Sequence, residues 1–138
     1  MDKLINPLQI SFVPGHHATD NVLIAHEFIH SFKKSSVKNG GLIVKIDLEK
    51  ACDKVDWGFI CQTLNLFKFP LRTIKLINTC IDSSSLAVMW NQEKLELFSP
   101  SHGLRQGDPL SPFLFVIYLE RISFLISQTV HENKWKTF

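Results

Sequence analysis

The spacing of apolar residues predicts three helices in the first two thirds of the chain. Residues 20–35 place Val22, Ala25, Ile29 and Phe32 on one face of a helix, and Thr19 or Asp20 can cap it. Residues 57–67 and 71–81 also have helical periodicity, and Pro70 separates them.

A fourth helix is predicted near the end of the chain. It begins at Asp108-Pro109 or at Ser111-Pro112, because each pair offers a capping side chain followed by proline in the first turn. It runs to about Ser127. Residues 113–119 are apolar on nearly all sides, so we expect this helix to lie beneath other elements.

Alternating apolar residues predict three strands. Residues 42–48 form the first, after a turn at 39–41. Residues 86–90 and 95–98 form a pair joined through 91–94. The order of elements predicts an α+β fold, with an antiparallel sheet and helices packed on one face. The sheet is small, which indicates a truncated domain.

Composition narrows the class of protein. The 138 residues are 45% hydrophobic and 20% charged, which is a globular balance, and the net charge of +2 neither favours nor excludes a nucleic-acid partner. The longest apolar run, 113–119, is shorter than a membrane span, so no membrane association is expected. Three widely spaced cysteines fit a reducing intracellular compartment, nuclear or cytoplasmic.

The helix at 20–35 carries a possible zinc motif. His26, Glu27 and His30 match HExxH, in which two imidazoles four residues apart hold zinc and the glutamate activates water. Lys33 lies on the same face, where its charge opposes a bound cation, and no third ligand stands in pattern. We therefore place these side chains at a border between core and solvent and keep a zinc-dependent hydrolase as the alternative.

Two further segments can carry chemistry. Asp47 ends the alternating strand, where a carboxylate can hold Mg²⁺, although Lys45 could simply pair with it. The loop 103–112 contains two glycines that allow close backbone approach, and Arg105 and Gln106 can hydrogen-bond to phosphate or base edges. The alternative for this loop is a plain helix entry set by its two prolines.

Together these segments carry a resemblance to a known family. Residues 45–55, with the sequence KIDLEKACDKV, resemble the first catalytic motif of non-LTR (LINE-type) retrotransposon reverse transcriptases. Residues 103–112, GLRQGDPLSP, resemble the next motif of that family. Segments 5–9, 12–15 and 19–21 resemble the region upstream of the first motif. The matches cover nearly all of the chain in the family's order, and plant elements look nearest.

The resemblance implies part of a right-hand polymerase palm with part of the fingers–palm junction. Residues 42–48 would be a central palm strand. Asp47 would be the first carboxylate of a two-metal Mg²⁺ centre, and the backbone carbonyl of Leu48 a further ligand. Arg105, Gln106 and Gly107 would border the incoming dNTP and the template base. The implied reaction is attack of a DNA primer 3′-hydroxyl on the dNTP, directed by an RNA template.

The sequence also departs from that family. The paired-aspartate motif should follow the last helix, yet no Asp occurs after Asp108, and the N-terminal fingers and the thumb are missing. Position 52 is Cys, where the family has Tyr or Phe to exclude the ribose 2′-hydroxyl. We therefore interpret residues 1–138 as one partial reverse transcriptase domain. We expect it to be inactive alone and to bind nucleic acid weakly or not at all; a non-catalytic nucleic-acid-binding remnant is a further alternative.

Overall fold

The computed structural model describes residues 5, 6, 9, 13, 15, 17–34 and 43–135. Its elements follow the order α1 (Ala18–Lys34), a 3₁₀ turn (Ala51–Lys54), α2 (Trp57–Leu66), α3 (Leu71–Asp82), β1 (Met89–Trp90), β2 (Glu93–Lys94) and α4 (Ser111–His131). All four predicted helices are present. The predicted turn at 39–41, Leu42 and much of the upstream segments 5–9 and 12–15 lie outside the described residues.

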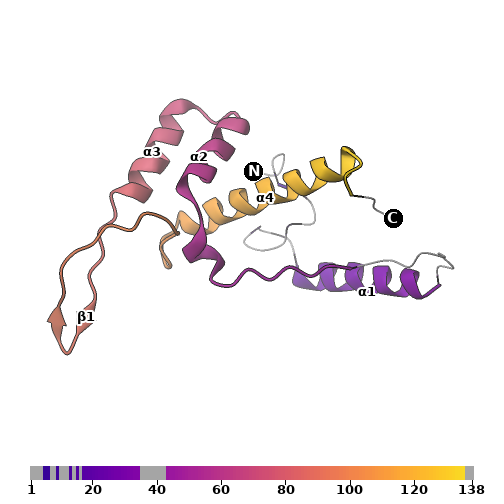
Figure 1. Cartoon of the computed structure of the whole chain (residues 1–138), viewed down its shortest axis with the longest axis horizontal. Coiled ribbons are helices and arrows are strands. Elements are labelled where there is room, and N and C mark those ends of the chain that lie inside the picture. Colours follow the sequence, from indigo (N-terminus) through magenta and orange to yellow (C-terminus); the bar gives the residue numbers. More distant parts are fainter. Residues whose placement is uncertain are drawn as a thin grey trace.

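A small core forms where α2, α3 and α4 meet. The helices α2 and α3 form an antiparallel pair, and α2 packs on the N-terminal half of α4 (Figure 1). The core side chains are less than a tenth exposed and come from these helices and from the segments before α2 and α4: Val55, Ile60, Leu64, Ile74, Leu104, Leu114 and Ile117. Thr63 is also fully buried, and its hydroxyl donates to the carbonyl of Phe59 at 2.7 Å, so its polar atom is satisfied.

Local signals account for the helix boundaries. Asp56 caps α2, since its carboxylate accepts from the amide of Phe59 at 2.6 Å. Pro70 stands immediately before α3, as the sequence predicts. Of the two starts considered for the last helix, the structure has the one at Ser111, with Pro112 in its first turn. The predicted capping role of Ser111 was wrong, because Leu110 is the N-cap and no side chain caps this helix. The predicted caps of α1 were wrong, because this helix already begins at Ala18 and places Thr19 and Asp20 inside its first turn.

The predicted strand at 42–48 is not formed. Residues 43–48 have no regular secondary structure, and the only sheet among the described residues is β1–β2. Their apolar side chains are about half to two thirds exposed: Ile43, Val44, Ile46 and Leu48. Alternation shows that a segment can be a strand, but a strand also needs a neighbour to pair its backbone groups. The described residues provide none here.

The predicted strand pair is confirmed as an antiparallel hairpin, but its turn was misplaced. Met89 pairs with Lys94 and Trp90 with Glu93, so the turn holds only Asn91 and Gln92. Both turn residues have positive φ, 48° and 67°, as a two-residue type I′ hairpin requires. The two arms pair again at Leu86 and Phe98. In the register of the first pairs Leu86 would face Leu97, so the second arm contains one extra residue, which indicates a bulge.

The part of the chain that the structure describes has an α+β fold, as predicted, with four α-helices and one small antiparallel sheet. The expected layering is not seen, because among the described residues α2 packs on α3 and α4, and the hairpin projects away from these helices (Figure 1). On the apolar face of α1, Val22 and Ile29 are also exposed. A sheet of two-residue strands offers too little surface to cover a helix.

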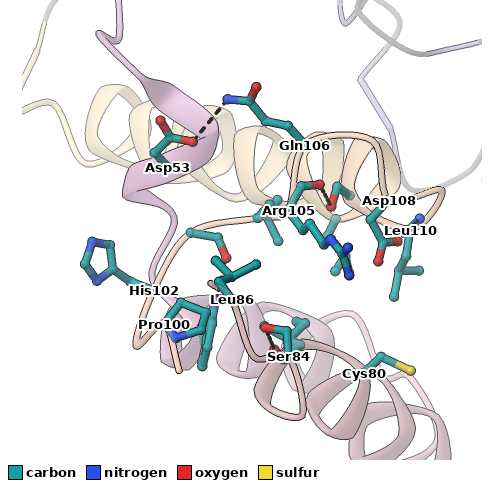
Figure 2. A pocket seen from close by; sticks show the side chains of 16 residues that line it. Asp53, Cys80, Ser84, Leu86, Pro100, His102, Arg105, Gln106, Asp108 and Leu110 are labelled. Atoms are coloured by element: carbon teal, nitrogen blue, oxygen red, sulfur yellow. Dashed lines mark hydrogen bonds between the residues drawn. The ribbon is translucent and has the colours of Figure 1, made fainter. Parts of the chain in front are cut away.

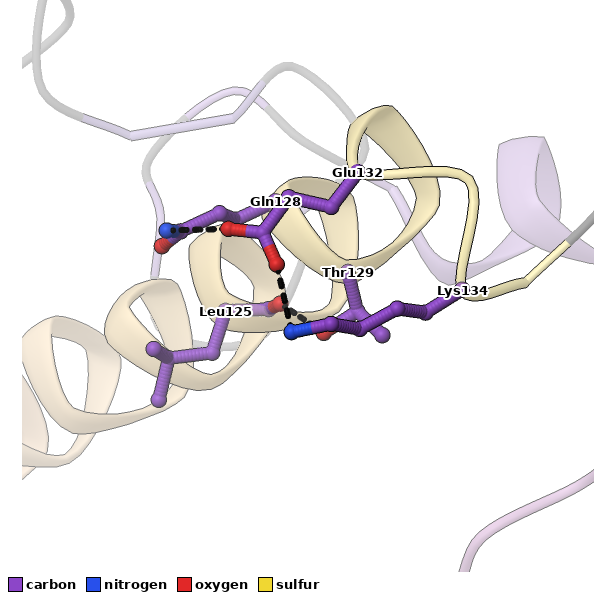
Figure 3. A network of polar contacts seen from close by, with 5 residues as sticks. All are labelled: Leu125, Gln128, Thr129, Glu132 and Lys134. Atoms are coloured by element: carbon purple, nitrogen blue, oxygen red, sulfur yellow. Dashed lines mark hydrogen bonds and ion pairs between the residues drawn. The ribbon is translucent and has the colours of Figure 1, made fainter.

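Helix α4 extends four residues beyond its predicted end. Near its C-terminus, Glu132 accepts from the Gln128 amide at 2.9 Å and pairs with the Lys134 ammonium at 2.7 Å (Figure 3). By length and composition alone, α4 is apolar enough to cross a membrane. Its side chains Leu114, Val116 and Ile117 are buried, as expected for a core helix, whereas Phe113 and Phe124 remain exposed.

Candidate nucleotide site

Three hydrogen bonds fasten the loop before α4 to the segment before α2 and to Trp57, the first residue of α2. The amide of Gly103 donates to the carbonyl of Val55, and the amide of Leu104 donates to the carbonyl of Cys52, both at 2.8 Å. The indole N–H of Trp57 donates to the carbonyl of Gly103 at 2.7 Å. We call this set of contacts the loop clamp. It brings Cys52 beside residues that lie about fifty positions later in the chain.

Gly103 has a backbone that only glycine tolerates. Its φ is +87°, in the left-handed region, and a Cβ at this position would lie 2.7 Å from the carbonyl oxygen of Asp53. The two segments therefore approach each other to a distance that leaves no room for a side chain.

The clamp creates an open cavity of about 430 Å³, which we call the Cys52 cavity. It contains four of the predicted site residues: Cys52, Arg105, Gln106 and Gly107. Pro109, Pro112 and Phe115 complete one wall with apolar surface. Gly107 has a φ of +88° and nothing within 4 Å of the position of a Cβ, so its backbone is open to close approach.

A second cavity, of about 420 Å³, lies on the other side of the same loop. It is bounded by Trp57, the end of α3 at Ile81 and the base of the hairpin at Leu86. Figure 2 shows Arg105 extending into it, while Gln106 turns toward Asp53 at its rim. The amide of Gln106 donates to the Asp53 carboxylate at 3.3 Å, a long bond between exposed groups.

Two hydrogen bonds also fix the backbone where the loop joins α4. The hydroxyl of Ser111 donates to the carbonyl of Arg105 at 2.7 Å, and the Asp108 carboxylate accepts from the amide of Leu110 at 2.7 Å. These bonds fix the backbone on either side of Gln106 and Gly107. Asp108 and Ser111 therefore contribute to the site by holding the loop backbone in place.

The other predicted site residues lie apart from the two cavities. Asp47 and Leu48 belong to the exposed segment 43–48 and line neither cavity. Of the predicted residues, the structure thus brings together Cys52, Arg105, Gln106 and Gly107. It leaves outside Asp47 and also Leu48, which was predicted to border both the metal ion and the nucleotide.

Comparison with known sequences gives the family. The pattern described as "Reverse transcriptase (RNA-dependent DNA polymerase)" matches residues 1–138, which is the whole chain. The chain belongs to the reverse transcriptase family. Members of this family act on nucleic-acid templates and use divalent metal ions.

Retrotransposon proteins are among the relatives of this reverse transcriptase segment. It is 29% identical over 118 residues to the "Transposon TX1 uncharacterized 149 kDa protein" of Xenopus laevis, covering 86% of this chain and 9% of that protein. It is 28% identical over 118 residues to a retrovirus-related Pol polyprotein from the type-2 retrotransposable element R2DM of Drosophila melanogaster, covering 85% and 11%. The chain spans about a tenth of the length of these relatives.

A plant protein matches a shorter part. An uncharacterized mitochondrial protein of Arabidopsis thaliana, AtMg01250, is 47% identical over 38 residues, or 28% of this chain and 31% of that protein. The two retrotransposon relatives above agree with the resemblance to non-LTR retrotransposon reverse transcriptases.

The donor set for Mg²⁺ is incomplete in the described part of this reverse transcriptase. Mg²⁺ prefers octahedral coordination by oxygen, and Asp47 and Leu48 offer one carboxylate and one carbonyl. Across residues 17–34 and 43–135, no three His, Cys, Asp or Glu side chains gather closely enough to hold a metal ion. The described residues therefore do not by themselves fit the metal centre that the resemblance implies.

The zinc motif receives no support. His26, Glu27 and His30 lie exposed on α1, and the described residues provide no third ligand beside them. Their exposure also differs from the predicted border between core and solvent, because Val22 and Ile29 on the apolar face of α1 are exposed as well.

Two residues of the site were missed by the sequence reasoning. Trp57 was assigned only to a helix, and Asp53 was given no role of its own within the motif at residues 45–55. Their contacts with Gly103 and Gln106 join segments separated by 46 and 53 positions. The signal that could have been used is the tryptophan itself, because a Trp N–H that becomes buried needs a hydrogen-bond acceptor elsewhere in the fold.

Proposed function

We propose that residues 1–138 form part of the palm of an RNA-directed DNA polymerase, and that the Cys52 cavity receives the incoming nucleotide. The observation that carries this proposal is the convergence of Cys52 with Arg105, Gln106 and Gly107 around one cavity. Two motifs that are distant in sequence face the same space, and the whole chain matches the reverse transcriptase family.

The side chains around the cavity suit a nucleotide. Arg105 borders both cavities, and its guanidinium extends into the second one in this structure. Turned toward the Cys52 cavity, this planar group can donate two parallel hydrogen bonds to phosphate oxygens. The Gln106 amide both donates and accepts, as contact with a base edge requires. The open backbone at Gly107 allows a base or sugar to approach closely. The small thiol of Cys52 then faces the sugar, where an aromatic ring would collide with a 2′-hydroxyl.

The chemistry proposed for the complete enzyme is attack of a primer 3′-hydroxyl on the α-phosphate of a dNTP, with pyrophosphate leaving. Asp47 and the Leu48 carbonyl are proposed as two of the oxygens that face the metal ions. Because the described residues do not complete that centre, we expect no primer extension by this chain alone.

The test places this segment in a complete enzyme. In a chimaera, the matching segment of a full-length reverse transcriptase of the family is replaced by residues 1–138. We expect the chimaera to extend an oligo-dT primer on poly-rA, and Asp47→Asn to reduce the rate about a thousandfold or more, as for loss of an essential charged group.

Asp82→Asn is the matched control, since Asp82 is also an exposed aspartate that lines neither cavity, and it ends α3, outside the two family motifs. It should leave the rate unchanged. An active chimaera in which Asp47→Asn and Asp82→Asn extend the primer equally fast would refute the proposal.

A further inference from the structure

We infer that Trp57 is a positioning residue for the nucleotide loop and sets the width of the Cys52 cavity without lining it. This inference rests on the proposed function of that cavity. Trp57 contributes no atom to the cavity wall, yet its indole N–H holds the carbonyl of Gly103 at 2.7 Å. The first loop residue that lines the cavity is Leu104, which directly follows Gly103.

The loop clamp leaves the two sides of the cavity little freedom to separate. On one side Cys52 accepts from the amide of Leu104, and on the other side Arg105 follows Leu104 directly. Leu104 is itself 5% exposed and packs in the core, so it cannot swing outward with the loop. The peptide unit between Gly103 and Leu104 is held at both of its polar atoms, because its N–H donates to the carbonyl of Cys52 and its carbonyl accepts from Trp57. Loss of the Trp57 bond therefore leaves one of the two bonds that fix the rotation of this unit.

The second side-chain contact between these segments is much weaker. The Gln106 amide reaches Asp53 at 3.3 Å, and both residues are exposed, so water competes for each group. The Trp57 bond is shorter and lies in a half-buried position beside the core residue Val55. A hydrogen bond is stronger where water is excluded. Trp57, and not Asp53, is therefore the side chain that holds the loop.

The test removes the indole donor and keeps an aromatic ring. In a Cys61→Ser, Cys80→Ser background, Trp57→Phe should raise the rate of Cys52 alkylation by iodoacetamide about fivefold, the effect of one hydrogen bond. Amide hydrogen exchange at Gly103 and Leu104 should accelerate by the same factor. Exchange at Leu64 and Ile74, in the cores of α2 and α3, should stay within about twofold.

Trp90→Phe and Trp135→Phe are matched controls, because both indoles are more than half exposed and lie far from the loop. They should change none of these rates. The inference is overturned if Trp57→Phe leaves Cys52 alkylation unchanged, or if it accelerates exchange in α2 and α3 as much as in the loop, since that is a general loss of stability.

A second measurement needs no variant of Trp57. In the unsubstituted chain, the indole proton of Trp57 should exchange with solvent at least about fivefold more slowly than those of Trp90 and Trp135. Equal exchange of all three would overturn the inference. No nucleotide is present in either experiment, so a negative result here is distinguishable from a failure of the nucleotide site itself.

Discussion

Replacing Gly103 with alanine tests the closest approach in the loop clamp. The added Cβ would meet the carbonyl oxygen of Asp53 at 2.7 Å, a distance that requires something to move. The residue must also keep a φ of +87°. Gly107→Ala is the matched control, since φ there is +88° and nothing lies within 4 Å of its Cβ.

Both substitutions place a side chain on a left-handed backbone, but only Gly103→Ala also forces a close contact with Asp53. A left-handed conformation costs an L-residue about 1–2 kcal/mol, which applies to both. Only in Gly103→Ala must the loop move away from Asp53, and this movement breaks the hydrogen bonds that Gly103 makes with Val55 and Trp57. At about 1 kcal/mol for each hydrogen bond, the difference between the variants is about 2 kcal/mol of unfolding free energy.

Urea denaturation followed by circular dichroism measures both free energies. We expect Gly103→Ala to lose about 3–4 kcal/mol and Gly107→Ala about 1–2 kcal/mol, with equal m-values. If the two variants lose the same stability, the close approach of the segments is not as described and the reasoning is refuted.

Two further predictions concern the sugar site and the end of α4. In the chimaera, Cys52→Tyr should raise selectivity for dNTP over rNTP by roughly tenfold to a hundredfold while dNTP incorporation stays similar, because a ring replaces open space; undiminished rNTP incorporation in a primer-extension assay would contradict this. The pKa of Glu132 is lowered from 4.5 by the Lys134 ammonium and by the Gln128 amide, so its ionised form is favoured in the fold; its contribution is present above pH 4.5 and lost as pH falls through the lowered pKa. Lys134→Gln should raise that pKa in an NMR titration, and an unchanged pKa would show that the pair does not form in solution.

The helices could be predicted because their signals are local. Apolar spacing located α2 and α3, and the proline at position 112 marked the start of α4 among two candidates. The end of α4 was placed too early because residues 128–131 continue the helix without a strong local signal. The periodicity of apolar residues lies within a single segment, so a helix can be predicted without knowing what the segment packs against.

The strand at 42–48 and the loop clamp could not be predicted in this way. Pairing depends on a second segment, and no pattern inside 43–48 supplies one. The hairpin turn was misplaced because Asn91 and Gln92 lack the glycine that usually marks positive φ. Trp57 and Gly103 meet through tertiary packing across 46 positions, although the family resemblance had already grouped Cys52 with Arg105, Gln106 and Gly107.

Protection of Cys52 by a nucleotide is the most direct measurement of whether its cavity receives the dNTP. The chimaera is bound to a poly-rA template and a dideoxy-terminated primer, and alkylation of Cys52 is followed by mass spectrometry. We expect dTTP, which complements the template, to slow alkylation about tenfold, whereas dGTP at the same concentration leaves it unchanged, because only the paired nucleotide fills the site. Equal alkylation rates with dTTP, with dGTP and without nucleotide would contradict the account.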